Sequence, residues 1–171
     1  MDRAEAPARA LSALDQGLAA LPNSTEIVQT KYQLLLGIKG PKDAISFVES
    51  RAKLDDPKGV VRRVLAEAYR TQNDLEKAEA VLRELIKSDP ADAVVASLLV
   101  RVTAQQAEQA AGKDHERERA LNEKVAGLLR DDRASFPTDP IFVQQECELA
   151  LRKGDFARAM TRLVPDRLRR R

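Results

Sequence analysis

The stretch that decides the fold is Val60–Lys87, VVRRVLAEAYRTQNDLEKAEAVLRELIK. Its apolar residues recur every three to four positions before and after Gln72-Asn73-Asp74, which predicts two helices joined by a short turn. Asp74 is placed to accept hydrogen bonds from the free N–H groups of the second helix, and Pro90 suits the first turn of the next one. The stretch therefore predicts an antiparallel helix hairpin.

The same pattern recurs along the chain at a period of 34 residues. Alanine is found at this spacing at Ala10, Ala44 and Ala78, and an aliphatic residue four positions later repeats with it. A period between about 20 and 50 residues indicates a solenoid, in which each unit buries its apolar face against its neighbours. We therefore expect an all-α fold built from stacked helix hairpins.

The hairpin resembles the tetratricopeptide repeat. The residues that carry the resemblance are Arg62-x-x-Leu65-Ala66-x-x-Tyr69, Ala78-x-x-x-Leu82 and Pro90. A degenerate copy lies 34 residues earlier, with Tyr32 and Ala44-x-x-x-Val48 in the same frame. The resemblance implies a right-handed superhelical stack of about nine antiparallel helices.

The last copy of the pattern lies further along the chain than two periods would place it. Ala78 and Ala159 are 81 residues apart, which is two periods and about 13 additional residues. We assign the additional residues to a polar segment around Thr103–Glu116 that lengthens both helices of one hairpin. The predicted organisation is a single domain, 1–171, with a half repeat at 4–21, repeats at 24–55, 57–89, 91–136 and 138–164, and a basic tail at 165–171.

Composition excludes several functional classes. Seven glycines, eight prolines and no tryptophan favour helices over sheet. The formal net charge is +2, and the four arginines of the tail contribute +4, so the rest of the chain carries −2. This body lacks the basic face that nucleic-acid binding requires. There is no run of 18 apolar residues and no signal-peptide pattern at the start, so we expect no membrane partner and a cytoplasmic location.

No group of residues predicts an enzyme, a cofactor or a metal site. The single cysteine, Cys147, aligns with Ala66 and is expected to be buried packing; the single histidine, His115, is expected in a solvated turn. The pairs Asp55-Asp56 and Asp131-Asp132 are expected to be exposed residues that cap helix ends and aid solubility rather than an acid/base pair. The tail residues Arg167–Arg171 are interpreted as a frayed end or the start of a further helix, with an arm for nucleic acid or an acidic surface as the alternative.

The resemblance also implies a binding face. In this family the first helix of each repeat lines a concave groove, and the alternative is an ordinary solvated helix face. Lys and Asn, which clamp the tails of heat-shock chaperones in the family, are replaced in the best repeat, so we do not expect that ligand. The corresponding positions here are Gln29, Gln33, Arg63, Glu67, Arg70, Arg101, Gln105, Gln144 and Glu148.

We therefore expect a scaffold that binds a peptide or a partner protein. A first alternative is a non-catalytic regulatory or substrate-presenting segment of a larger enzyme. A second is nucleic-acid binding through the arginine tail. The leucines of the N-terminal half repeat, Leu11, Leu14, Leu18 and Leu21, further suggest pairing between two copies of the chain.

Overall fold

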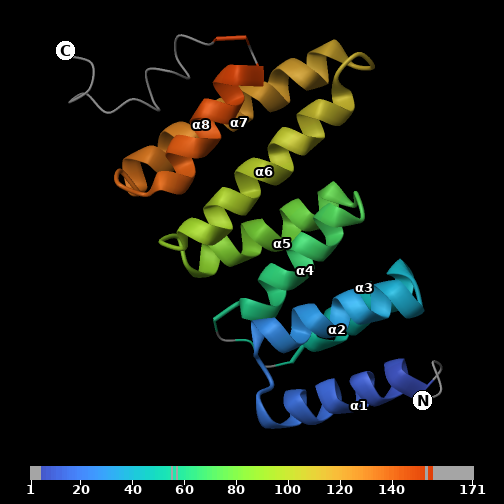
Figure 1. Ribbon diagram of the computed structural model, residues 1–171. Helices are drawn as coiled ribbons and strands as arrows, with labels where there is room; N and C mark the ends of the chain where they lie inside the picture. The colour runs from blue at the N-terminus through green and yellow to red at the C-terminus, as the bar shows by residue number, and fades with distance from the viewer. Residues whose placement is uncertain (1–4, 55, 57, 153, 156–171) are drawn as a thin grey trace, which may run out of the picture. The chain divides into compact units, whose positions relative to one another are not determined.

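The computed structural model of the chain describes residues 5–54, 56, 58–152 and 154–155. These residues form eight α-helices and contain no strand (Figure 1). The second helix of the last predicted repeat and the basic tail fall on residues 156–171, outside the described part of the chain. The helices are α1 Glu5–Ala20, α2 Thr25–Ile38, α3 Pro41–Ala52, α4 Val60–Thr71, α5 Leu75–Ser88, α6 Ala93–Ala110, α7 His115–Ser135 and α8 Pro140–Arg152.

The chain divides into two compact units, residues 1–90 and 91–171, and each is described by itself. In the first unit, the hairpins α2–α3 and α4–α5 follow one another, and α4 packs against both α2 and α3. Helix α1 packs against α2, where Lys31 forms an ion pair with Asp15 (Figure 1).

The repeating positions supply the core of the first unit. Ala44, Val48, Ala78 and Leu82 have no exposed surface. Ala10 departs from this pattern, because it is exposed on α1. The leucines of the predicted half repeat are partly covered by the chain itself, since Leu18 on α1 is buried while Leu21, which follows the end of α1, is 61% exposed. Pairing of two copies through this helix stays a prediction.

A serine and two glycines shape the turns that precede α2, α3 and α4. Ser24 accepts a hydrogen bond from the N–H of Ile27 at the start of α2. Gly40 precedes Pro41 with a φ of +88°, a conformation that favours glycine. Gly59 precedes α4 with a φ of +63°, and a Cβ atom there would lie 2.3 Å from Cδ2 of Leu85.

Two predicted helix starts were wrong in detail. The side chain of Asp74 makes no capping hydrogen bond at α5, because its carboxylate forms an ion pair with Lys77 at 2.7 Å instead. Pro90 lies before α6 rather than in its first turn. Helix α6 begins at Ala93, and Asp92 caps it by accepting from the N–H groups of Val94 and Val95.

The second unit contains the long hairpin α6–α7 and the shorter α8. Helix α6 has 18 residues where α4 has 12, and α7 has 21 where α5 has 14, so the additional residues lengthen both helices. Its core includes Val100, Leu129 and the fully buried Phe142, whose ring stacks on that of Phe136 with centroids 5.3 Å apart. No helix in the described part of the chain combines the length and apolarity needed to cross a membrane.

Candidate functional site

A groove opens between α2 and α4 in the first unit. It has a volume of about 270 Å³. Helix α2 contributes Gln29, Tyr32 and Gln33. Helix α4 contributes Val64, Glu67, Ala68 and Thr71. The first helices of two consecutive repeats therefore form its two walls, and three of the nine predicted face residues, Gln29, Gln33 and Glu67, lie in it together.

The floor of the groove is apolar and held by a short chain of hydrogen bonds. Val64 and Ala68 are buried, as is Tyr32 at 4% exposure. The Tyr32 hydroxyl lies 3.3 Å from Oγ1 of Thr71, which itself donates to the carbonyl of Ala68 at 2.9 Å. Because a hydroxyl has a single proton to donate, the Tyr32 hydroxyl is the donor to Thr71. Gln72 Nε2 donates to Tyr32 at 3.4 Å, so both helices are tied together beneath the groove.

Glu67, the charged residue of the groove lining, pairs with Arg70, which lies outside the lining. Arg70 donates from Nε and Nη2 to the two carboxylate oxygens of Glu67 at 2.8 and 2.7 Å, which is a bidentate arrangement. The hydrogen bonds to Glu67 raise the pKa of Arg70, against a smaller opposing effect of burial. The pair as a whole carries no net charge, so this wall is polar without being strongly basic or acidic.

Gln29 and Gln33 differ from this pair. Both side chains are exposed, and neither forms a hydrogen bond with another residue in the described part of the chain. They stand one helical turn apart on α2, so their carboxamides form a short row along one wall. Each carboxamide carries two N–H donors and a carbonyl acceptor, which leaves the row able to bind peptide groups.

The other predicted face residues lie outside this groove. Arg63 is on α4, where Nη2 donates to the carbonyl of Lys58 at 3.4 Å. Arg101 and Gln105 are on α6, and Gln144 and Glu148 are on α8, where the Gln144 amide donates to Glu148 at 3.0 Å. These four belong to the second unit.

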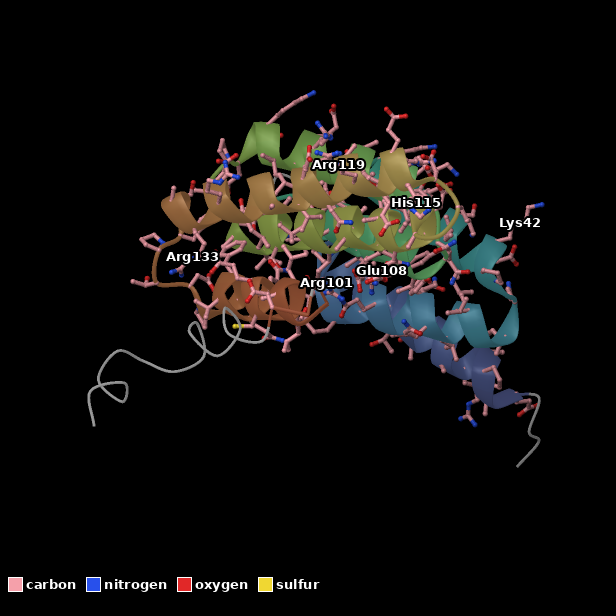
Figure 2. The ribbon with its side chains drawn as sticks, turned by 90° about the horizontal axis from the view of Figure 1, so that it is seen from above. Lys42, Arg101, Glu108, His115, Arg119 and Arg133 are labelled. Atoms are coloured by element: carbon pink, nitrogen blue, oxygen red, sulfur yellow. The ribbon has the colours of Figure 1, made fainter. Side chains whose placement is uncertain are left out.

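The second unit has a notch of its own, with a volume of about 370 Å³. Its apolar surface comes from Ala104, Ala107 and Ala111 beside Leu149 of α8, and its polar rim comes from Glu108, Glu118 and Asn122. Figure 2 labels Arg101 and Glu108 on α6, and His115 at the tip of the long hairpin. None of the four face residues predicted in this unit lines the notch.

The cysteine and the histidine considered for chemistry lie in opposite environments. Cys147 is buried, as expected for packing, at 4% exposure. His115 is 90% exposed, with Nδ1 lying 3.6 Å from a carboxylate oxygen of Glu118. No cluster of three potential metal ligands is found among the described residues.

The expectation that the aspartate pairs serve as helix caps is confirmed for Asp56, whereas the expectation of exposure holds for Asp131 but was wrong for Asp56 and Asp132. Asp56 is buried, because its carboxylate accepts from the N–H groups of Val60 at 2.8 Å and Arg62 at 3.0 Å and thereby caps α4. Asp132 is half-buried, and burial followed by repulsion from Asp131 raises its pKa to about 6. Asp55 lies outside the described residues.

Sequence reasoning missed the groove floor and the notch. Tyr32 occupies one of the positions that define the repeat, and Ala68 and Thr71 lie shortly after the equivalent position one period later. The repeat pattern could therefore have predicted that these three residues lie close together. The notch was less accessible, because it depends on how far α8 extends along the longer α6 and α7.

Comparison with known proteins finds a family model that matches part of the chain. Residues 41–102 match the family model for the tetratricopeptide repeat. The resemblance drawn from the sequence is confirmed over this segment, and the described part of the chain has the all-α helical-repeat fold of tetratricopeptide repeat structures.

Solved structures of low sequence identity share this fold. The human IFIT1 dimer with PPP-AAAA has a TM-score of 0.69 and 15% identity over 89% of this chain and 34% of its own. TTC0263, a thermophilic tetratricopeptide repeat protein of Thermus thermophilus, has a TM-score of 0.64 and 16% identity over 82% of this chain and 71% of its own. MamA has a TM-score of 0.55 and 18% identity over 89% and 81%.

The chain thus spans about a third of the length of IFIT1. No curated protein matches the sequence.

Proposed function

We propose that this protein is a non-catalytic interaction scaffold that binds a peptide segment of a partner protein in the groove between α2 and α4. The observation that carries the proposal is the groove itself, with an apolar floor and polar walls on the first helices of two consecutive repeats. A groove held open by packed helices binds without first being ordered, which lowers the entropic cost of association.

The composition of the groove favours a peptide over a nucleic acid. The IFIT1 structure contains PPP-AAAA, so a similar ligand on the same fold is the alternative to weigh. Phosphate recognition requires arginine or lysine side chains whose charge is available. The groove lining contains neither residue type, and the adjacent Arg70 is paired with Glu67.

The proposal is tested by filling the groove. The partner is captured from the native cell extract with the wild-type chain, identified by mass spectrometry, produced as a pure protein and titrated by calorimetry. Thr71→Trp places an indole at an exposed position of the lining. We expect the affinity to fall at least tenfold, which corresponds to about 1.4 kcal/mol.

Thr30→Trp is the matched control. Thr30 is also exposed and lies on α2, but it is not part of the lining. We expect its affinity to remain within about twofold of wild type. Equal affinities for the wild type and Thr71→Trp, with both proteins folded by circular dichroism, would reject the groove as the binding site.

A regulatory or substrate-presenting role in a larger enzyme uses the same groove. It predicts that the captured partner is a substrate of a catalytic domain encoded in the same gene. The full-length gene sequence distinguishes this role from that of a separate scaffold.

A further inference from the structure

We propose that the notch in the second unit binds an arginine side chain presented by a partner protein. The notch is lined by α6, α7 and α8, and it is separate from the groove of the proposed function, which belongs to the first unit. Three features of the notch carry the proposal: its origin in the lengthened hairpin, its apolar floor and the oxygen acceptors on its rim.

The notch owes its existence to the residues that lengthen the hairpin α6–α7. More than half of its lining falls in the additional polar segment around Thr103–Glu116. These lining residues are Ala104, Ala107, Glu108 and Ala111. Helix α7 supplies Glu118 and Asn122, and the shorter α8, with 13 residues against 21 in α7, supplies Leu149. Hairpins of ordinary length lack the additional segment, so the notch is a feature of this chain and not of the repeat in general.

The floor of the notch is apolar and consists largely of alanine. Ala104, Ala107 and Ala111 follow one another at spacings of three and four residues, which places them on one face of α6 and its C-cap. Leu149 packs against the core of the unit and borders the floor. Because alanine side chains are short, they leave room for the three methylene groups of an arginine. Such a stem is buried against apolar surface while its charged end stays at the water-exposed rim.

The rim of the notch presents oxygen acceptors from two helices. Glu108 of α6 and Glu118 of α7 contribute carboxylates. The Glu118 carboxylate lies 3.6 Å from Nδ1 of His115, which is too far for a hydrogen bond. Asn122 donates from Nδ2 to the carbonyl of Glu118 at 3.0 Å, and within the described part of the chain its Oδ1 accepts no hydrogen bond. Two carboxylates and a carboxamide oxygen therefore face the same space.

This arrangement of charge is complementary to a guanidinium group. None of the described lining residues is basic. Arg119, the neighbour of Glu118 in the sequence, lies outside the lining and forms an ion pair with Glu123 at 3.2 Å (Figure 2). A guanidinium has five N–H donors in one plane, so it can donate to more than one of these acceptors at once. A lysine ammonium is more strongly hydrated, and we expect it to bind less tightly.

The test uses the full chain labelled with ¹⁵N and acetylated, amidated pentapeptides of glycine and alanine in which only the central residue is varied. The arginine probe should shift the backbone amide signals of Ala107 and Ala111 and the side-chain NH₂ signal of Asn122. Citrulline matches the shape of arginine but carries no charge, so the citrulline probe should bind about fivefold more weakly. The glutamate probe should bind more weakly than either, because the rim repels it.

A double variant removes the charge of the rim while keeping its shape. Glu108→Gln/Glu118→Gln should weaken the arginine probe by about fivefold, because two partly exposed ion pairs are lost. Glu116→Gln/Asp131→Asn is the matched control, since both residues are exposed on α7 outside the lining and the change in net charge is the same. We expect this control to stay within about twofold of wild type. Ala111→Trp, at an exposed position of the floor, should weaken the arginine probe by filling the notch.

Equal affinities for the arginine and citrulline probes would overturn the proposal, and so would equal losses in the two double variants. Deletion of residues 167–171 tests whether the arginines of this chain compete for the notch. If the shortened chain binds the arginine probe more than about threefold tighter than wild type, the tail occupies the notch and the assignment to a partner is wrong. Unchanged affinity supports the partner. The Thr71→Trp experiment is independent of these measurements, because Thr71 lies in the first unit.

Discussion

Gly59→Ala should destabilise the first unit by about 1–4.6 kcal/mol, because the substitution has both a backbone cost and a packing cost. Gly59 has a φ of +63°, and placing an L-residue in that conformation costs about 1–2 kcal/mol. The added Cβ would also lie 2.3 Å from Cδ2 of the buried Leu85, which must then shift within a packed core at a cost of about 1–3 kcal/mol. The lower entropy of the unfolded chain offsets about 0.4–1 kcal/mol of the total.

A double-mutant cycle separates the two costs. Leu85→Val removes the Cδ2 atom, so Gly59→Ala in that background should cost only the backbone term of about 1 kcal/mol. Gly112→Ala gives an independent value for this term, because Gly112 has a φ of +71° and a Cβ added there would have no atom within 4 Å. Urea unfolding followed by circular dichroism measures each free energy. Equal costs of Gly59→Ala in the wild-type and Leu85→Val backgrounds would refute the packing of α5 against the start of α4.

Three further substitutions test other features. Asp132→Asn should stabilise the fold by about 1 kcal/mol near neutral pH. The pKa of Asp132 is raised from 3.8 to about 6 in the folded state, so its carboxylate destabilises the fold increasingly as the pH rises through this window. The gain should vanish below about pH 4, and an equal gain at both pH values in urea titrations would contradict it. Asp56→Ala should lower the free energy of unfolding by about 1–2 kcal/mol because it removes the cap of α4, while Asp74→Ala should lower it by under about 0.5 kcal/mol. Equal decreases in the free energy of unfolding of the two variants would show that the cap is unimportant. Gly37→Ala should raise the stability by about 0.5–1 kcal/mol, because Gly37 is helical and open space surrounds its Cβ position; a lower melting temperature would contradict this.

The repeat frame made much of the fold predictable. The buried positions Ala44, Val48, Ala78 and Leu82 follow the period of 34 residues because each occupies the same site in successive hairpins. The lengthening of α6 and α7 was predictable for the same reason, since the additional residues displaced the later copies of the pattern. Ala10 was not predictable from its period, because burial depends on what packs against each copy.

The capping residues were less predictable. Asp56 and Asp74 both precede a helix, yet only Asp56 caps one. The difference arises from side-chain geometry. The Asp74 carboxylate forms an ion pair with Lys77, whereas the Asp56 carboxylate accepts a hydrogen bond from a backbone N–H group of α4. The sequence pattern alone does not distinguish these two outcomes.

The groove was predictable only in part. Gln29, Gln33 and Glu67 were assigned to the binding face from the resemblance to the tetratricopeptide repeat, and all three line one groove in the structure. The bond between Tyr32 and Thr71 joins residues 39 positions apart in different repeats, so it depends on how the two hairpins pack. The Glu67–Arg70 pair has the spacing of a helical ion pair, and that signal was available in the sequence.

Site-specific photo-crosslinking tests the central proposal most directly. A benzophenone amino acid replaces Gln33 in the groove in one sample and Thr30 outside the lining in another, and each protein is irradiated with the purified partner. We expect an adduct from position 33, mapped by mass spectrometry to an extended segment of the partner, and none from position 30. A stable complex that crosslinks from position 30 but not from position 33 would contradict binding in the groove between α2 and α4.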